Sequence, residues 1–405
     1  MRSLAVLSMH TSPLAQPGSG DSGGMNVYVR ELVGALAQAG VDAEVFVRRT
    51  DPSLPDVVDV EPGFRVVHID AGPFDLPKED LPDVLELFGD GVADRMRTRG
   101  GYDAIHANYW LSGVVGHRLK HELSLPLVST FHTLARVKAE TGDDEPQRRI
   151  DAETQVIACS DAILANCAAE VTQLVELYGA DPSRVEIVPP GVDHAFFSPG
   201  DRKGARLALG LGDHPVLLFA GRIQPLKGLT IAIAALAELD QKFDDAVLVV
   251  VGGPSGAEGE AELAAARSLI NELGLSERVQ FVPPQPHHLL STYYRAADVC
   301  VVPSRSESFG LVALEAAACG TPVVAAAVGG LLTLVEDGVT GFLIDTRNPS
   351  DYAAAIDKLL GDKPMSLLMD SAAADYARHY TWSTTAARLR RLYADLTLRA
   401  PVSCD

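Results

Sequence analysis

Two cations, Arg222 and Lys227, bracket a short loop in the segment VLLFAGRIQPLKG, residues 216–228. The apolar run before the loop predicts a strand, and the residues after it predict a helix. Backbone N–H groups at a helix N-terminus and two cationic side chains, all at the carboxyl end of a strand, suit a phosphate or a diphosphate. The alternative is a pair of solvated charges on an exposed loop.

A second segment with strand–loop–helix order, VVPSRSESFGLVALEAAACGTPVV at residues 301–324, carries two carboxylates. Glu307 is expected in the loop and Glu315 near the second turn of the helix. Eight positions apart, their side chains would point within about 80° of one another if both were helical. Such carboxylates accept hydrogen bonds from ribose or sugar hydroxyls, and amides near residues 309–311 would meet a diphosphate. The segment VGGPSG, residues 251–256, is expected to approach the same ligand closely.

A glycine-rich loop, GSGDSGGMNVY, spaces Gly18, Gly20 and Gly23 as in the G-x-G-x-x-G turn of dinucleotide-binding proteins. Two observations argue against an NAD(P)-dependent oxidoreductase. A stretch with two prolines separates these glycines from the first apolar run. The fingerprint also requires an acidic residue about 20 positions later, at the end of the next strand. The sequence has only Asp42 there, and it lies at the start of that strand. The loop instead predicts a helix from about residue 24, whose N-terminus favours an anion or a hydroxyl-rich ligand, or else a plain turn.

Residues with the spacing of metal ligands are missing from the sequence: it has no D-x-D motif, and the adjacent His287 and His288 cannot converge on one ion. A departing diphosphate would then be neutralised by Arg222, Lys227 and a helix dipole, so no cofactor is expected to be required for catalysis. The cysteines form no C-x-x-C pair and are predicted to be reduced, mostly buried thiols. They are Cys159, Cys167, Cys300, Cys319 and Cys404.

Short β-branched runs alternate with amphipathic stretches of helix length along all 405 residues. This alternation is typical of α/β proteins, in which helices cover both faces of parallel sheets. Strands are predicted at residues 4–8, 43–47, 65–69, 104–107, 127–131, 162–165 and 185–188, and then at 216–220, 247–251, 279–282, 299–302, 322–325 and 341–344.

A turn-rich segment, VPPGVDHAFFSPGDRKG, separates the two series of strands. Because the chain is also long for a single core, we expect two Rossmann-like domains, residues 1–190 and 191–381. Ligands are expected in an interdomain cleft, at the carboxyl ends of the strands. A helix predicted at 382–398 is expected to pack back on the first domain.

The formal net charge of −20 argues against polyanionic partners. An acidic surface repels nucleic-acid phosphates and anionic lipids, so neither nucleic acid nor a membrane is an expected partner. The longest apolar stretches are too short to span a bilayer, and the first residues predict a strand rather than a signal peptide. With the cysteine usage, these features favour a cytoplasmic protein.

The segments ESFGLVALE, GRIQPLKG and PPGVD together resemble the retaining glycosyltransferases of the GT-B architecture. In the first half, MHTSPLAQPGSGDSGGMNVY, AGPFDLPKEDLP, NYWLSG and HTLARVK are similar to one subfamily. Its members transfer N-acetylglucosamine from UDP-N-acetylglucosamine to 1D-myo-inositol 3-phosphate, the first step of actinobacterial mycothiol synthesis. The likeness covers nearly the whole chain. Sucrose-phosphate synthases share a related glycine loop, so a different acceptor is one alternative, and a non-catalytic nucleotide-sugar sensor is another.

The resemblance implies a role for individual residues on the donor side. Arg222 and Lys227 would bind the diphosphate, Glu315 the ribose, Glu307 the transferred sugar, and the segment around Gln285 the uracil. The full donor set is Gly24, Arg222, Lys227, Gln285, Glu307, Ser308, Phe309, Gly310, Leu311 and Glu315. His132 would lie beside the transferred sugar, which makes Arg222, Lys227, Glu307 and His132 the expected catalytic residues.

The resemblance also implies an acceptor set and an ion site. The inositol would contact His10, Gln16, Asp21, Ser22, Gly23, Gly24, Met25 and Asn26, and its phosphate would contact Lys78, Tyr109, Thr133 and Arg149. A structural Mg²⁺ would bind backbone oxygens at Tyr294, Arg295, Ala297 and Thr321, and a homodimer is left open. Three positions depart from the family pattern: Asn108 replaces the usual His, Leu332 a Pro, and Cys167 a Thr.

Overall fold

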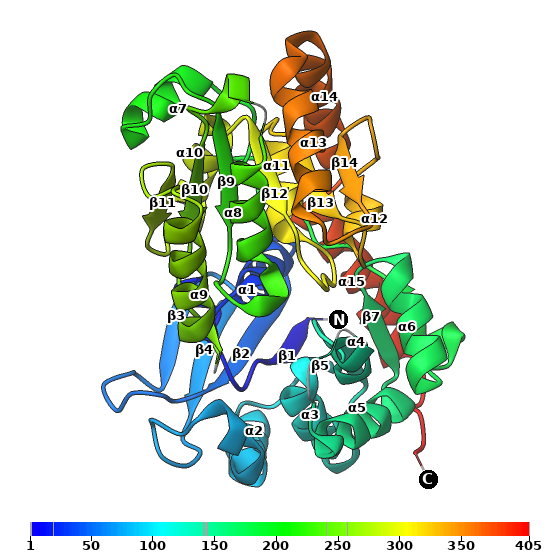
Figure 1. Cartoon of the computed structure of the whole chain (residues 1–405). Helices are drawn as coiled ribbons and strands as arrows, with labels where there is room; N and C mark the ends of the chain where they lie inside the picture. The colour runs from blue at the N-terminus through cyan, green and yellow to red at the C-terminus, as the bar shows by residue number, and fades with distance from the viewer. Residues whose placement is uncertain are drawn as a thin grey trace. The chain divides into compact units, whose positions relative to one another are not determined.

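A computed structural model of the chain describes residues 2–18, 20–140, 142, 145–239, 241–256 and 258–404. The chain divides into two compact units, each an α/β sandwich (Figure 1). The first unit contains Met25–Gly191, the segment before Gln16 and the segment from Trp382 onward. The second contains Val192–Thr381 together with Gln16–Gly24, of which Ser19 lies outside the described residues.

The first unit is built on an eight-stranded sheet with the order β3-β4-β2-β1-β5-β6-β7-β8. Its strands are β1 (Ser3–Leu7), β2 (Asp42–Arg48), β3 (Val57–Glu61), β4 (Phe64–Ile69), β5 (Ala104–Asn108), β6 (Leu127–Thr130), β7 (Ala162–Ala165) and β8 (Val185–Ile187). All neighbouring pairs are parallel except β3–β4. The seven strands predicted here are confirmed within a residue at each end, whereas β3 was not predicted. Its side chains are half-buried or exposed at the sheet edge, so it lacks the continuous apolar run of the inner strands.

Helices cover both faces of the first sheet. They are α1 (Gly24–Gln38), α2 (Leu85–Arg99), α3 (Tyr109–Leu123), α4 (Ala135–Glu140), α5 (Gln147–Cys159), α6 (Ala168–Tyr178) and α15 (Trp382–Thr397), with 3-10 turns η1 (Lys78–Val84) and η2 (Pro182–Arg184). Leu36 of α1 and Leu389 of α15 share one core, while Phe88 of α2 and Leu111 of α3 belong to another. The last helix, α15, drawn in red in Figure 1, is fixed to β5 by a 2.7 Å hydrogen bond between the Tyr393 hydroxyl and His106 Nδ1.

The second unit is built on a six-stranded parallel sheet with the order β11-β10-β9-β12-β13-β14. Its strands are β9 (Val216–Ala220), β10 (Val247–Val251), β11 (Val279–Val282), β12 (Val299–Val302), β13 (Val323–Ala326) and β14 (Gly341–Ile344), all predicted within one residue. Alternate side chains of β9 enter different cores: Leu217 and Phe219 on one face, Val216 and Leu218 on the other. In such a sheet the loops at the carboxyl ends of the strands meet at one edge.

The helices of the second unit pack on both faces of this sheet. They are α7 (Arg202–Leu209), α8 (Leu229–Ala237), α9 (Gly259–Glu272), α10 (His287–Ala296), α11 (Leu311–Ala318), α12 (Leu331–Leu334), α13 (Pro349–Gly361) and α14 (Lys363–Ala377), with 3-10 turns η3 (Pro225–Lys227) and η4 (Gln241–Phe243). Throughout the described residues of the chain, every helix is too short or too polar to cross a lipid bilayer.

The cysteines divide into two groups. Cys167, Cys300 and Cys319 are buried and take no part in the disulfide, as predicted. The prediction of reduced thiols is wrong for Cys159 and Cys404, which form a disulfide with their Cα atoms 5.4 Å apart. The two residues are 245 positions apart in the sequence, so no local spacing could indicate that they meet.

Candidate functional site

An ion pair joins two loops at the carboxyl edge of the second sheet. Lys227 ends η3, in the loop after β9, and Glu307 lies in the loop after the neighbouring strand β12. The Lys227 ammonium lies 2.6 Å from Glu307 Oε2, and the two side chains remain 24% and 16% exposed. The loops approach closely at Gly228, where a Cβ would lie 2.4 Å from the Pro303 carbonyl oxygen. A cation and a hydrogen-bond acceptor thus stand together where the sequence predicts a phosphate site.

The loop that carries Glu307 is clamped by a pair of glycines. The Gly330 N–H donates to the Glu307 carbonyl at 2.9 Å, and a Cβ on Gly329 would lie 1.9 Å from that carbonyl oxygen. Gly310, with φ +104°, then precedes the first turn of α11. The predicted residues Ser308, Phe309, Gly310 and Leu311 therefore lie at the N-terminus of α11, whose backbone N–H groups favour an anion.

Glu315 is buried on α11 and held by two side chains of α10. His287 Nε2 lies 2.7 Å from Glu315 Oε1, and the Tyr294 hydroxyl donates to Oε2 at 2.9 Å. Burial, followed by the charge of Glu315, raises the pKa of Tyr294 well above its usual value, so this hydroxyl stays a donor. A carboxylate offers about four lone-pair positions, so two remain for ligand hydroxyls. Sequence reasoning missed both contacts, since His287 was considered and rejected as a metal ligand and Tyr294 was named only for its backbone oxygen.

The glycine-rich loop packs against the loops of the second sheet. The Gln16 side-chain amide donates to the Gln285 carbonyl at 2.5 Å, and a Cβ on Gly23 would lie 3.0 Å from Arg222 Nε. Residues that the resemblance assigns to the acceptor therefore lie directly beside the donor residues Arg222 and Gln285. The helix predicted from about residue 24 is confirmed as α1.

Several predicted acceptor residues gather around one aromatic ring in the first unit. Tyr109 begins α3 with the left-handed φ of +73°, a conformation that costs energy for a bulky residue and is typical of functional sites. The rings of His10 and Tyr109 are 4.5 Å apart. The Lys78 ammonium and the Arg149 guanidinium lie 5.6 Å and 5.1 Å from the centre of the Tyr109 ring. The sequence had placed these four residues in separate segments.

Arg149 is fixed by several partners. Its Nε lies 2.7 Å from Glu153 and its Nη1 2.8 Å from Glu145, and its Nη2 donates to the Thr133 carbonyl at 3.0 Å and to the Thr133 hydroxyl at 3.1 Å. Burial opposes its charge, but Tyr109, Glu153 and Glu145 together raise the pKa of Arg149. The guanidinium is therefore permanently charged and orients Thr133, while two carboxylates already balance it.

His132 is paired with the residue that departs from the family pattern. His132 Nε2 lies 2.9 Å from Asn108 Oδ1, and the buried Asn108 Nδ2 has no hydrogen-bond partner within the described part of the chain. Burial, then the charge of His106, lowers the pKa of His132 to about 3. The imidazole is therefore neutral at physiological pH, and next to it lies a buried amide nitrogen for which the described residues provide no acceptor.

Three other predicted acceptor residues have structural contacts. Asn26 Nδ2 donates to the Thr11 hydroxyl at 2.5 Å and to the Ser12 carbonyl at 2.6 Å, which holds the segment after His10 against α1. The Ser22 carbonyl accepts from Gly18 N–H at 2.9 Å. Met25 is half-buried and packs against the core shared by α1 and α15. A fourth predicted residue, Asp21, is also half-buried.

The expected magnesium ligands surround the C-terminus of α10. The Thr321 hydroxyl lies 2.6 Å from the Tyr294 carbonyl oxygen, and both residues are fully buried. Arg295 and Ala297 are on the same turn. Carbonyl groups at a helix C-terminus carry partial negative charge, and backbone carbonyl oxygens are ligands that a hard cation such as Mg²⁺ accepts. This set of residues therefore fits a Mg²⁺ ion.

The paired α/β units and their site loops define a glycosyltransferase of the GT-B class. Residues 23–191 match the family "Glycosyl transferase 4-like domain", and residues 204–378 match "Glycosyl transferases group 1". The chain is 49% identical to D-inositol 3-phosphate glycosyltransferase 2 of Catenulispora acidiphila, over 97% of this chain and 95% of that one. It is also 49% identical to D-inositol 3-phosphate glycosyltransferase of Geodermatophilus obscurus, over 97% of this chain and 89% of that one. The chain belongs to the D-inositol 3-phosphate glycosyltransferase family.

Solved structures support the same fold. Sucrose-phosphate synthase from Thermosynechococcus elongatus is 34% identical, with a TM-score of 0.92 over 98% of this chain and 100% of that one. HepE from Anabaena, in complex with UDP-glucose, is 22% identical and has a TM-score of 0.79. The match covers 98% of this chain and 100% of that one, which shows the shared fold. The GT-B fold and the glycosyltransferase resemblance stated from the sequence are thus confirmed.

Proposed function

We propose that the chain transfers N-acetylglucosamine from UDP-N-acetylglucosamine to 1D-myo-inositol 3-phosphate, with retention of anomeric configuration, in the cytoplasm and in a mycothiol-type pathway. The observation that carries the proposal is the 49% identity over nearly the full length to relatives named for D-inositol 3-phosphate. The Lys78 ammonium beside Tyr109 supports a phosphorylated acceptor, because a cation suits a phosphate ester. The Arg149 guanidinium, although two carboxylates balance its charge, adds N–H donors beside the same ring.

Residues of the second unit hold the donor in this proposal. Lys227, Arg222 and the N–H groups at the start of α11 bind the diphosphate. Glu315 accepts hydrogen bonds from the ribose hydroxyls with its remaining lone pairs, and Glu307 accepts from hydroxyls of the transferred sugar. Because Lys227 is paired to Glu307, the cation is positioned before the donor arrives and needs little rearrangement as charge develops.

In the reaction, the bond between the anomeric carbon and the diphosphate oxygen breaks, and a bond from that carbon to the acceptor oxygen forms. The acceptor hydroxyl enters from the face of the leaving group and passes its proton to a phosphate oxygen of the departing UDP. Lys227 and Arg222 stabilise the growing negative charge on the diphosphate, a role that is usually the largest single contribution to such a reaction. Glu307 binds a hydroxyl and forms no covalent intermediate, in contrast to retaining glycosidases.

Residues of the first unit hold the acceptor. Lys78 and Arg149 bind its phosphate beside Tyr109, with Thr133 oriented by Arg149. The neutral imidazole of His132 and the Asn108 amide hydrogen-bond to the transferred sugar. A Mg²⁺ ion at Tyr294, Arg295, Ala297 and Thr321 would stabilise the end of α10 by balancing its carbonyl dipoles, away from the bonds that change.

The test offers the purified chain a panel of nucleotide sugars with three acceptors: inositol phosphate, unphosphorylated inositol and fructose 6-phosphate. The proposal expects the highest kcat/KM for UDP-N-acetylglucosamine with inositol phosphate, and an NMR anomeric coupling that matches the donor configuration. A preference for fructose 6-phosphate would favour the chemistry named for the sucrose-phosphate synthase relative. Tight donor binding without any product would instead indicate a nucleotide-sugar sensor, and an inverted coupling would overturn the retaining mechanism.

A further inference from the structure

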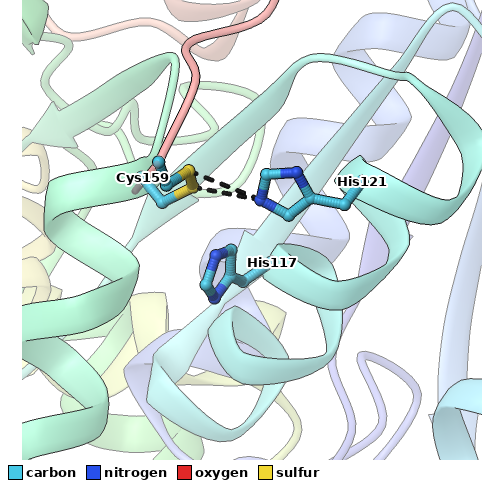
Figure 2. A group of neighbouring side chains, drawn as sticks. His117, His121 and Cys159 are labelled. Carbon is cyan, nitrogen blue, oxygen red and sulfur yellow. Dashed lines mark hydrogen bonds between the residues drawn. A yellow bond between two sulfur atoms is a disulfide. The ribbon is translucent and has the colours of Figure 1, made fainter.

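A cluster of nitrogen and sulfur ligands lies on the first unit, and the proposed function does not use it. His117 and His121 project from α3, Cys159 ends α5, and Cys404 follows α15. One potential ligand atom from each of the four residues lies within 4.8 Å of all the others. Figure 2 shows the two imidazoles and the Cys159 sulfur gathered at one place, with both sulfur atoms of the disulfide next to the His121 ring.

The spacing of the two histidines suits a shared ligand. They are four residues apart on α3, so they lie on the same face of the helix. The statement from the sequence that metal-ligand spacing is missing overlooked this pair. Their rings are 5.1 Å apart in an edge-to-face arrangement. Two imidazoles one helical turn apart are a recurrent way to hold a zinc ion.

The distances from His121 to the sulfurs also match a coordination sphere. His121 Nε2 lies 3.3 Å from Cys159 Sγ and 3.4 Å from Cys404 Sγ. In a tetrahedral site with Zn–N of about 2.05 Å and Zn–S of about 2.3 Å, a nitrogen and a sulfur ligand are about 3.5 Å apart. The imidazole nitrogen thus already stands near the separation that a zinc ion would impose.

The segment that carries Cys404 is fixed close to this site. The Val402 N–H donates to Asp161 Oδ1 at 2.5 Å. The other oxygen of Asp161 lies 2.9 Å from the buried Lys120 ammonium of α3, which also donates to the Cys159 carbonyl at 2.7 Å. These contacts bring Cys404 to Cys159 and the histidines by anchors that do not depend on the sulfur–sulfur bond.

We propose that in its dithiol form this chain binds one Zn²⁺ through His117, His121, Cys159 and Cys404. A thiol reductant converts the disulfide to two Cys thiols and is itself oxidised to its disulfide. Zn²⁺ then displaces the two thiol protons, and two thiolates and two neutral imidazoles form a tetrahedral N₂S₂ set. Thiolate and imidazole donors without a carboxylate favour zinc over magnesium or calcium. The bound ion would join α3, α5 and the segment after α15, whatever reaction the chain catalyses.

Metal titration of the full-length chain tests this proposal. The protein is reduced with a phosphine under anaerobic conditions and titrated with Zn²⁺ against a chromophoric chelator. We expect one tightly bound equivalent, absent from the oxidised protein. Co²⁺ in place of Zn²⁺ should give the intense visible bands of a tetrahedral ion and a thiolate-to-metal charge-transfer band in the near ultraviolet.

Ligand variants separate this site from adventitious binding. Cys404→Ser and the exposed His121→Ala should each weaken Zn²⁺ binding by about 100-fold or more, because loss of an outer partner alone costs 10–100-fold. Cys319→Ser removes a buried free thiol and His379→Ala an exposed imidazole elsewhere, so these controls should bind as the parent does. The proposal is overturned if the reduced parent binds no stoichiometric Zn²⁺, if Co²⁺ gives only weak octahedral bands, or if Cys404→Ser binds like the controls. Circular dichroism confirms that each variant is folded.

Discussion

The Lys227 ammonium and the Glu307 carboxylate stand 2.6 Å apart and join the loops after β9 and β12. This pair holds the cation in place before any ligand binds. Lys227→Ala should lower kcat by about 10²–10³, the loss typical of removing one group that stabilises developing charge. The substituted side chain is partly exposed, so the thermal unfolding midpoint should stay near that of the parent. Steady-state kinetics and calorimetry check both expectations.

Two further variants show whether the effect of Lys227→Ala is specific. Glu307→Gln keeps the shape of the side chain but removes the charge that positions Lys227, so kcat should fall while donor binding persists. Lys203→Ala removes an exposed cation on α7 in the same unit and should leave turnover unchanged. Near-parental turnover in Lys227→Ala would contradict the assignment of this loop to the diphosphate.

The close contact of Gly329 with the Glu307 carbonyl leads to a second prediction. Gly329 has φ +49°, and an added Cβ would lie 1.9 Å from the Glu307 carbonyl oxygen. Gly329→Ala must therefore displace the loop that carries Glu307, and kcat should fall by about 100-fold, since small misplacements at a reacting centre have costs of that order.

Gly338 provides the matched control for this substitution. It also has a positive φ, +74°, but a Cβ there would meet no atom within 4 Å. Gly338→Ala therefore imposes the same kind of backbone strain without displacing Glu307. It should lower the free energy of unfolding by about 1–2 kcal/mol and leave kcat unchanged. Equal losses of kcat in both variants would show that strain, not the position of Glu307, accounts for the effect.

Most of the fold follows from the sequence, because parallel strands buried on both faces appear as unbroken apolar runs between amphipathic helices. Strands such as β9 and β10 were predicted at their observed bounds for this reason. The exception, β3, is an edge strand whose polar side chains break the run. The residue types of β3 alone do not indicate that it pairs with β4.

The site was predictable only where its residues lie in one segment. Glu307 and Glu315 follow one strand, so their common position could be inferred from helix geometry. His287 reaches Glu315 from another helix, and Cys404 reaches Cys159 across 245 residues. Contacts of this kind depend on how elements pack, and a single sequence does not encode them in any local pattern.

The cation beside Tyr109 leads to a third prediction. Lys78 lies 5.6 Å from the Tyr109 ring, and in our proposal it binds the acceptor phosphate. Lys78→Ala should raise KM for the phosphorylated acceptor by about 10- to 100-fold, the equivalent of one lost charge-assisted hydrogen bond. KM for the donor should not change. The preference for phosphorylated over unphosphorylated inositol should fall by the same factor, and an unchanged preference would place the phosphate elsewhere.

The buried His106 makes the free energy of unfolding depend on pH. His106 accepts or donates hydrogen bonds with Thr130 and Tyr393, and burial lowers its pKa to about 3. An unfolded chain binds a proton at this residue below about pH 6.5, whereas the folded chain does not until about pH 3. The contribution of His106 to the free energy of unfolding is therefore fully present above about pH 6.5. It is lost progressively as the pH falls from about 6.5 towards 3.

The variant His106→Gln isolates this contribution, because Gln retains a donor and an acceptor but does not titrate. Denaturant unfolding of the parent and the variant should be compared at pH 7, 6, 5 and 4.5. Below about pH 6, the stability of the parent relative to the variant should decline by about 1.4 kcal/mol per pH unit. Other titrating groups, such as Glu170 with its raised pKa of about 7, affect both proteins equally and cancel in the difference. A difference that is constant across this range would mean that His106 takes up its proton at the same pH in the folded and the unfolded chain.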